Sequence, residues 1–241
     1  NIILPFIFDE LLYMPMTQKQ EIFTLMGGRV RFYRGRYNPT ADAVWLAAFG
    51  AGRPVKTVLD VGVGTGGAAL CLAANMPGAR ITGLDISPDM LAECEKNASI
   101  NACDIELINT DITKWRTDRT FDTVITNPPY FKGTPARHNA HHNADLALWA
   151  RKCLARVKPR GTFVIITDAA TTASVLSEMA AKCGDIEIFP LFGAKTTAER
   201  VLMQGRIGTR GPTVIHRGLS MNEPTILRDG LTIKDALAKL S

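Results

Sequence analysis

A regular alternation of strand-like and helix-like segments, beginning at residue 55, restricts the fold of this chain more than any other feature. Short apolar runs predict buried strands at 55–61, 79–86, 104–109, 121–126 and 162–167. Segments between and after them predict helices at 64–75, 87–101, 144–157 and 172–182. Repeated strand–helix–strand units build a parallel sheet with helices on both faces, and such sheets bind ligands outside the carboxyl ends of their strands.

Two further strands, at 186–192 and 199–208, follow without a clear helix between them. Parallel neighbours need a long crossover connection, whereas antiparallel neighbours need only a short one. We therefore expect an α/β, Rossmann-like fold with a seven-stranded, mostly parallel sheet and an antiparallel last strand.

The two ends of the chain lie outside this alternation. Asn38-Pro39-Thr40 predicts a helix start with Thr40 as N-cap, followed by an apolar helix over 41–49. At the other end, residues 231–240 predict a short amphipathic helix. The predicted division is an N-terminal extension (1–26), a domain (27–220) and a C-terminal tail (221–241).

Composition indicates a globular protein of a reducing compartment. No apolar run in the 241 residues approaches the roughly 20 that a membrane helix requires, and the start, NIILPFIF, is a poor signal peptide. Five cysteines without CxxC spacing argue against disulfides or a zinc site. HNAHH at 138–142 has metal-ligand character, but no carboxylate or cysteine cluster supports it. We expect a cytoplasmic, monomeric protein that contacts no membrane and holds no metal.

A glycine-rich loop at 60–67, DVGVGTGG, joins the first expected strand to its helix. Glycine permits positive φ and lets the backbone approach a ligand closely. The loop fits the GxGxxG pattern of dinucleotide-binding folds, in which Asp85 would be the acidic residue that ends the second strand. It fits a D-x-G-x-G-x-G loop equally well, with Asp60, Gly62, Gly64 and Gly66 at the fixed positions.

The fourth expected strand runs directly into Asn127-Pro128-Pro129-Tyr130. Two consecutive prolines lock φ and donate no N–H, so the turn is stiff and continues neither a helix nor a central strand. A rigid turn at the carboxyl end of a strand, holding an amide and flanked by aromatic rings, suits the binding of a planar substrate.

The Asp60 loop together with NPPY resembles the class I S-adenosylmethionine-dependent methyltransferases, whereas a nicotinamide enzyme has no reason to carry NPPY. The resemblance implies that Asp85 binds the ribose hydroxyls and Asp111-Ile112 the adenine. It also makes the segment with Thr40 and Asp42 similar to the one that closes over the methionine end of the cofactor. The cofactor-binding residues implied in this way are Asp60, Gly62, Gly64, Gly66, Asp85, Ile86, Asp111, Ile112, Asn127 and Thr40.

NPPY in this family implies methylation of a planar amino nitrogen in adenine, cytosine or a glutamine amide. Such a nitrogen is a poor nucleophile because its lone pair is delocalised. The side-chain oxygen of Asn127 and the carbonyl of Pro128 can accept hydrogen bonds from its N–H groups and so favour the transition state. Tyr130 and Phe131 can stack on its plane. The predicted catalytic residues are Asn127, Pro128, Pro129 and Tyr130.

Two NPPY families compete. RFYRGRYNPTADAVWLAAF (31–49), NPPYF and RVLMQGRIGTRGP are similar to the bacterial tRNA(Val) adenine-37-N6-methyltransferase family. The release factor glutamine methyltransferases share this core but carry a separate helical N-terminal domain, for which about 40 residues are too few. Adenine N6 in RNA is therefore the expected target, with a protein glutamine or ribosomal RNA as the alternative.

Basic residues support a nucleic acid partner. The net charge is +5, and three basic segments, at 17–36, 132–145 and 195–217, are expected near the strand ends that form the site. The alternative for the first two is an ordinary solvated surface. The substrate-binding residues that we predict are Tyr130, Phe131, Lys132, Arg137, Arg34 and Arg36.

Overall fold

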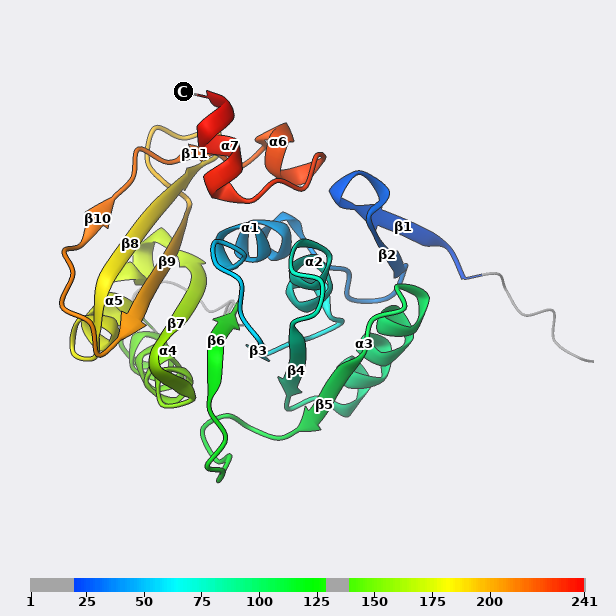
Figure 1. Cartoon of the computed structure of the whole chain (residues 1–241), viewed down its shortest axis with the longest axis horizontal. Coiled ribbons are helices and arrows are strands. Elements are labelled where there is room, and N and C mark those ends of the chain that lie inside the picture. Colours follow the sequence, from blue (N-terminus) through cyan, green and yellow to red (C-terminus); the bar gives the residue numbers. More distant parts are fainter. Residues whose placement is uncertain (1–19, 129–138, 241) are drawn as a thin grey trace, which may run out of the picture.

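A computed structural model describes residues 20–128 and 139–240, with side chains at 20–128 and 145–239. Its centre is one sheet with the strand order β10-β8-β9-β7-β6-β3-β4-β5, and β11 also pairs with β8 (Figure 1). The strands are β3 (Thr57–Val61), β4 (Arg80–Asp85), β5 (Ile105–Asn109), β6 (Phe121–Thr126), β7 (Val157–Asp168), β8 (Cys183–Phe192), β9 (Arg200–Ile207), β10 (Val214–Ile215) and β11 (Leu219–Ser220). Only β9 runs antiparallel to its described neighbours, β7 and β8. The predicted sheet is confirmed, and β10 and β11 extend it beyond the predicted seven strands.

Helices cover both faces of the sheet, as predicted. α1 (Ala41–Gly50), α2 (Gly67–Asn75) and α3 (Pro88–Ile100) contribute to the core on one face, and α4 (Asn139–Leu154) and α5 (Thr172–Ala180) to the core on the other. Apart from Asp42, α1 is apolar all round, and nearly all of it is buried, since the sheet and the C-terminal segment enclose it (Figure 1). Among the described residues, no helix has both the length and the apolar character needed to span a membrane.

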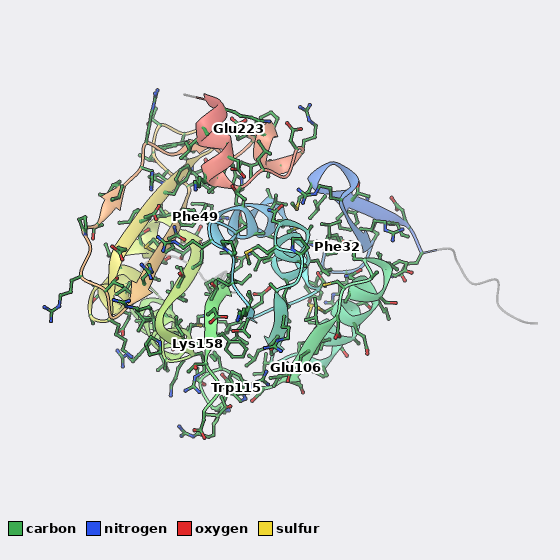
Figure 2. All side chains as sticks on the ribbon, viewed as in Figure 1. Phe32, Phe49, Glu106, Trp115, Lys158 and Glu223 are labelled. Carbon is green, nitrogen blue, oxygen red and sulfur yellow. The ribbon has the colours of Figure 1, made fainter. Side chains whose placement is uncertain are left out.

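Alternate residues of the central strands feed these two cores. Val58 and Ile125 pack in the core with α1–α3, whereas Leu59 and Val124 pack in the core with α4 and α5. This is the period-two alternation of a strand buried on both faces. Phe49 at the end of α1 lies in the first core, on the inner side of the helix (Figure 2).

The predicted helix starts are present. Ser87 caps α3 by accepting a hydrogen bond from the Met90 N–H at 3.4 Å, with Pro88 as the first helical residue. Thr40 has the extended backbone of an N-cap before α1, but its side chain makes no capping hydrogen bond. That hydroxyl does not fix the helix start.

β7 begins at Val157 and includes Pro159, Arg160 and Gly161, which is a correction to the expected strand at 162–167. Between two successive pairs of residues in this part of the sheet, β6 advances by two residues and β7 by five. The extra residues of β7 form a bulge. A Cβ on Gly161 would lie 2.7 Å from the Asp122 carbonyl oxygen, which explains why glycine stands there. Lys158 pairs with the Asp122 carboxylate at 2.8 Å beside the bulge (Figure 2).

The basic segment before α1 contains a β-hairpin that was not predicted. β1 (Ile22–Leu25) pairs antiparallel with β2 (Val30–Tyr33) through the short helix η1 (Met26–Gly28). Phe32 of this hairpin is buried in the core (Figure 2). The predicted boundary between residues 26 and 27 therefore falls within one hydrogen-bonded unit.

The C-terminal segment packs on the same side of the molecule as the hairpin (Figure 1). It contains α6 (Pro224–Leu227) and α7 (Ile233–Leu240), and α7 matches the predicted helix. Ile226 and Ala236 are buried in the core that contains α1, and the Arg29 guanidinium donates to the Gly230 carbonyl at 3.0 Å. The division of the chain into extension, domain and tail stays a prediction.

Candidate functional site

The carboxyl ends of β3, β4, β5 and β6 bring together most of the predicted site residues that the structure describes. Val61 pairs with both Leu84 and Thr126, and Asp85 pairs with Asn109. The glycine loop, Asp85, Asp111 and Asn127 therefore leave the sheet at one edge, where ligands bind in this kind of fold.

The glycine loop needs its glycines for conformation. Gly62, Gly64 and Gly66 have φ of 75°, 55° and 90°, a region that disfavours residues with a Cβ. The Gly62 and Val63 N–H groups both donate to the Leu84 carbonyl, at 2.8 and 3.0 Å. The loop is thus folded back over the end of β4.

Asp85 ties this loop to the start of α3. One carboxylate oxygen accepts from the Gly64 N–H at 2.8 Å, and the other from the Ser87 N–H at 2.9 Å. A carboxylate has about four acceptor positions, so these two bonds leave capacity for ribose hydroxyls. Beside it, Ile86 is 68% exposed, which is unusual for a large apolar side chain and offers a surface to a flat ring.

Asn109 holds the Asp85–Ile86 backbone in place, and its role was not predicted. Its side-chain amide donates to the carbonyls of Asp85 and Ile86, at 3.1 and 3.0 Å. The only feature of the sequence that could have indicated this role is the position of Asn109 as the last residue of a strand.

Asp111 and Ile112 follow β5, as expected. The Asp111 carboxylate accepts two hydrogen bonds from Thr113, from its N–H and its hydroxyl, each at 2.8 Å. Burial alone would raise the pKa of Asp111, but the bonds from Thr113 and the nearby Lys114 outweigh it and lower the pKa below its usual value. Ile112 is buried, so its side chain belongs to the core next to the site.

Asp60 is a buried carboxylate with a free acceptor. The side chain is 2% exposed, and its Oδ2 atom has no hydrogen-bond partner. Burial, and to a lesser degree the negative charge of Asp85, raises the pKa of Asp60 to about 7, against the lowering effect of a hydrogen bond from the Ala69 backbone. An amino group that reached this oxygen would satisfy it and favour the ionised carboxylate.

Asn127 has a second free acceptor at the end of the adjacent strand. Its Oδ1 atom is buried without a hydrogen-bond partner, and Pro128 after it is buried. Buried polar atoms of folded proteins are usually paired, so an unpaired one marks a place where a ligand donor fits. Asn127 and Asp60 each offer such an atom.

A chain of hydrogen bonds fixes the strand ends from which these two residues project. The Trp149 indole N–H donates to the Thr126 hydroxyl at 3.0 Å, and that hydroxyl donates to the Val61 carbonyl at 2.7 Å. The indole also closes off Gly62, where a Cβ would lie 3.4 Å from the ring. Trp149 and Thr126 were not predicted as site residues, because nothing in their local sequence shows that α4 packs against this edge.

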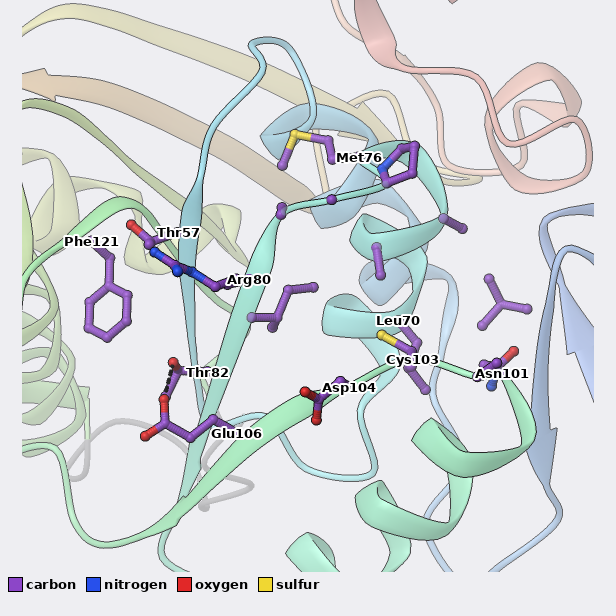
Figure 3. A pocket seen from close by; sticks show the side chains of 18 of the residues that line it. Thr57, Leu70, Met76, Arg80, Thr82, Asn101, Cys103, Asp104, Glu106 and Phe121 are labelled. Atoms are coloured by element: carbon purple, nitrogen blue, oxygen red, sulfur yellow. Dashed lines mark hydrogen bonds between the residues drawn. The ribbon is translucent and has the colours of Figure 1, made fainter.

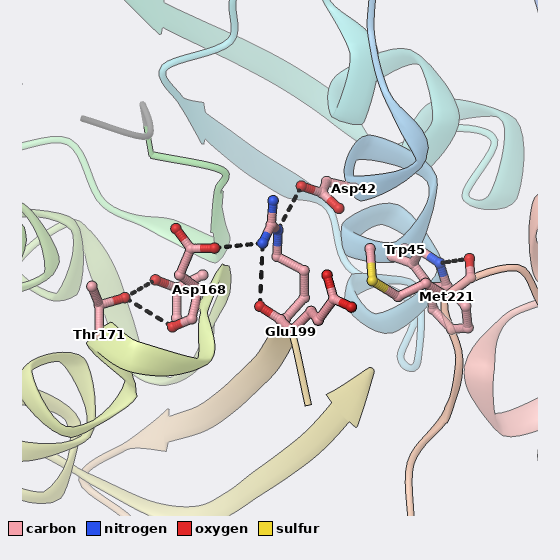
Figure 4. Close-up of polar contacts among 8 residues, drawn as sticks. Asp42, Trp45, Asp168, Thr171, Glu199 and Met221 are labelled. Carbon is pink, nitrogen blue, oxygen red and sulfur yellow. Dashed lines mark hydrogen bonds and ion pairs between the residues drawn. The ribbon is translucent and has the colours of Figure 1, made fainter. Parts of the chain in front are cut away.

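Arg200 was predicted within a basic, substrate-facing segment, but its guanidinium lies between two carboxylates. It contacts Asp42 at 3.2 Å and Asp168, which places it between the start of α1 and the end of β7 (Figure 4). Arg206 lies at the other end of β9, away from the site, and its guanidinium is 3.7 Å from the Asp185 carboxylate. The expectation that the whole basic segment adjoins the site was therefore wrong.

Arg34 and Arg36 lie on the path from the hairpin to α1. The Tyr33 N–H donates to the Asn97 side chain of α3 at 3.0 Å, and Pro39, further along the chain, lies against Gly67 at the start of α2. Arg34 pairs with Glu21 at 3.0 Å and is 51% exposed. The Arg36 guanidinium lies 5.4 Å from the centre of the exposed Tyr37 ring.

Five predicted catalytic or substrate-binding residues lie outside the described residues. They are Pro129, Tyr130, Phe131, Lys132 and Arg137. The side chains of the HNAHH segment are likewise not described. Within the described ranges, no group of three histidine, cysteine or acidic side chains is placed to hold a metal ion.

A cavity of about 690 Å³ lies at the other edge of the sheet, at the amino ends of β4 and β5 (Figure 3). Its polar groups are largely engaged with one another, because Glu106 accepts from Thr82 at 2.9 Å and from the Arg119 guanidinium at 2.7 and 2.5 Å. None of the predicted site residues lines it. We therefore assign the candidate site to the carboxyl ends of β3, β4, β5 and β6.

The raised pKa of Asp60 predicts a pH-dependent stability. Between pH 3.8 and about 7 the folded chain holds a proton on Asp60 that the unfolded chain has lost, so stability falls as pH rises through this window. Three pKa units correspond to about 4 kcal/mol, and one kcal/mol to about 2–4 °C in Tm for a chain of this size. Asp60→Asn should therefore raise the Tm of the ligand-free protein at pH 8 by at least about 5 °C.

Calorimetry at pH 5 and pH 8 would check this, with Asp104→Asn as the control at an exposed carboxylate. The gain from Asp60→Asn should be larger at pH 8 than at pH 5. An equal Tm change at both values of pH would contradict the assignment of a buried, proton-binding carboxylate.

Comparisons with known proteins agree with this geometry. The family model described as "Methyltransferase small domain" matches residues 42–189, which is more than half of the chain. A tRNA1(Val) (adenine(37)-N6)-methyltransferase of Glaesserella parasuis is 27% identical over 138 residues, covering 53% of this chain and 59% of that protein. A release factor glutamine methyltransferase of Deinococcus radiodurans is 35% identical over 96 residues, covering 39% of this chain and 34% of that protein. The matches thus span less than two thirds of either relative.

Among solved structures, a predicted O-methyltransferase of Agrobacterium tumefaciens superposes with a TM-score of 0.61 at 24% identity, covering 74% of this chain and 86% of that one. At this identity the likeness concerns the fold, and it confirms the predicted Rossmann-like methyltransferase architecture. The chain belongs to the methyltransferase small domain family.

Proposed function

We propose that this chain binds S-adenosylmethionine at the carboxyl edge of its sheet and transfers the methyl group to an exocyclic amino nitrogen of adenine in RNA. The observation that carries the proposal is the pair of buried, unpartnered oxygens on adjacent strand ends, Asp60 Oδ2 and Asn127 Oδ1. Asp60 Oδ2 suits the ammonium group of an amino acid, and Asn127 Oδ1 suits an amino group that is to be methylated.

The described residues fit the cofactor along its length. Asp85 has acceptor capacity left for ribose hydroxyls, and Ile86 offers an exposed apolar surface to the adenine ring. Asp111 is held ionised beside them and can accept from the adenine amino group. Asp60 takes the cationic end, where ion pairing offsets the desolvation that raises its pKa. When bound, the cofactor supplies a methyl group on a positively charged sulfur.

Asn127 would orient the nitrogen that receives this methyl group. Its side-chain oxygen accepts one N–H, which turns the nitrogen lone pair toward the methyl carbon and stabilises the positive charge that develops. The Trp149–Thr126–Val61 hydrogen bonds hold the end of β6 rigid while this happens. Asn127 is an acceptor here and not a base, because its amide does not take up a proton near neutral pH.

RNA is the favoured acceptor on three grounds. Relatives include tRNA adenine methyltransferases, and the chain has a net charge of +5. The Arg36–Tyr37 pair, exposed near the cofactor edge, combines a cation for phosphate with a ring on which a base can stack. A target adenine would have to leave its stack to enter the site. The second candidate is a glutamine side chain of a protein, which the match to a release factor glutamine methyltransferase favours.

Removing the acceptor at Asn127 should stop transfer without preventing cofactor binding. For Asn127→Ala we expect a loss of about 10²–10³-fold in the single-turnover rate, the size seen when one transition-state hydrogen bond is removed. The Kd for S-adenosylmethionine should stay within about threefold, because most cofactor contacts lie on other strands. Asn127→Asp, which keeps an acceptor oxygen, should lose less. Normal turnover in the alanine variant would refute the role of this residue.

The class of substrate can be tested with the methyl-labelled cofactor and total bacterial RNA or total bacterial protein. We expect label in RNA, recovered as N6-methyladenosine after nucleoside digestion. Binding to that RNA should weaken at least about tenfold between 50 and 200 mM salt, because phosphate contacts release counterions. Label in glutamine of protein, with none in RNA, would instead establish the second candidate.

A further inference from the structure

The guanidinium of Arg200 joins three segments that are far apart in the sequence. Arg200 is the first residue of β9, and it contacts Asp42 in the first turn of α1 at 3.2 Å. It also contacts Asp168, the last residue of β7, and donates to the Glu199 carbonyl at 3.2 Å (Figure 4). A planar guanidinium can bind several acceptors in a fixed geometry, which a lysine ammonium does not reproduce.

This bridge is partly withdrawn from water. The side chain of Asp42 is 9% exposed and that of Arg200 25%, whereas Asp168 is 41% exposed. An ion pair with one buried partner resists salt and holds its geometry better than a surface pair. Losing the arginine would remove this cation from the buried Asp42 carboxylate and break the tie between the first turn of α1 and the end of β7.

The first turn of α1 in turn borders the glycine loop. A Cβ on Gly67 would lie 2.7 Å from the Pro39 side chain and 3.1 Å from that of Ala43, so α1 begins in close contact with the start of α2. Asp60 accepts a hydrogen bond from the backbone of Ala69, two residues further along α2. The first turn of α1 therefore adjoins the start of α2, the helix whose backbone bonds the Asp60 carboxylate.

The other end of the bridge lies on the side of the sheet where β6 ends. Thr126 pairs with Ile165, so the last residues of β7 extend beyond the end of β6 beside Asn127. Hydrogen bonds from the Thr171 hydroxyl to the Asp168 carbonyl, at 2.9 Å, and between the hydroxyls of Thr167 and Thr171, at 2.5 Å, fix this end of β7 (Figure 4). The bridge therefore spans the site from the glycine-loop side to the acceptor side.

We propose that Arg200 is a positioning residue, which holds the first turn of α1 against the glycine loop and thereby sets the affinity of the site for the amino acid end of the cofactor. This inference rests on the proposed function, since it assigns that end to Asp60. The adenosine end lies at Asp85, Ile86 and Asp111, on strands that Arg200 does not contact.

Binding to the two ends of the site can be measured separately with two ligands. S-adenosylhomocysteine carries both the adenosine and the amino acid, whereas 5′-methylthioadenosine keeps the adenosine and the sulfur but lacks the amino acid. For Arg200→Met, calorimetry should show Kd for S-adenosylhomocysteine raised at least about tenfold, the effect of losing one hydrogen bond to a charged group. Kd for 5′-methylthioadenosine should change by less than about twofold, because no charged contact is lost at the adenosine end.

Arg206→Met is the matched control, because Arg206 lies on the same strand, pairs with Asp185 and is 29% exposed, but stands at the far edge of the sheet. It should change neither Kd. Asp168→Asn weakens the bridge but keeps the contact between Arg200 and Asp42, so it serves as the test if Arg200→Met does not fold. For Asp168→Asn we expect a smaller rise in the Kd for S-adenosylhomocysteine and no change in the Kd for 5′-methylthioadenosine.

If Arg200→Met or Asp168→Asn bound both ligands equally more weakly, or bound both with unchanged Kd, the positioning role would be overturned. The proposed function would still stand. A wild-type protein that binds neither ligand would overturn the cofactor assignment and the positioning role together. Selective loss of S-adenosylhomocysteine would support the role even if the methyl acceptor proved to be a protein.

Discussion

The buried carboxylate of Asp60 is the constraint around which the carboxyl edge of the sheet is arranged. It stands near the end of the central strand β3, with one oxygen bonded to the α2 backbone and the other free. Such a group opposes folding above its unfolded pKa. The chain tolerates it because the two cores on either side of β3 bury most of the strand's apolar side chains.

The same free atom that weakens the ligand-free fold is what a cationic ligand would recognise. A site that satisfied every polar atom internally would be more stable and would have less to offer a ligand, which is the usual compromise between stability and function. Asn127 repeats this arrangement one strand away with a neutral amide. Around them, hydrogen bonds of Asp85, Asn109, Thr126 and Trp149 hold the ends of the strands in position.

The sequence was sufficient to predict those parts of the fold and site that depend on local patterns. Strand–helix alternation gave the sheet, and the glycine spacing gave a loop whose three glycines do have positive φ. Residues that act through tertiary contacts were missed. Trp149 resembles any core residue of a helix until α4 is placed against β6. The hairpin at 22–33 belongs to a segment interpreted as basic because its arginines have no acidic residue beside them. Whether the predicted site residues bind as proposed stays a prediction.

The arginines show why charge alone is a weak guide to a nucleic acid partner in this chain. Arg29 donates to the carbonyls of Ala74 and Gly230 and so joins the hairpin to α2 and to the C-terminal segment. Arg200 lies between two carboxylates, and Arg206 pairs with Asp185 at the edge away from the site. A guanidinium committed in this way contributes to the long-range field but not to a phosphate contact. The case for RNA therefore depends less on the net charge of +5 than on cations among the described residues that remain exposed near the cofactor site, such as Arg36 with its ring partner Tyr37.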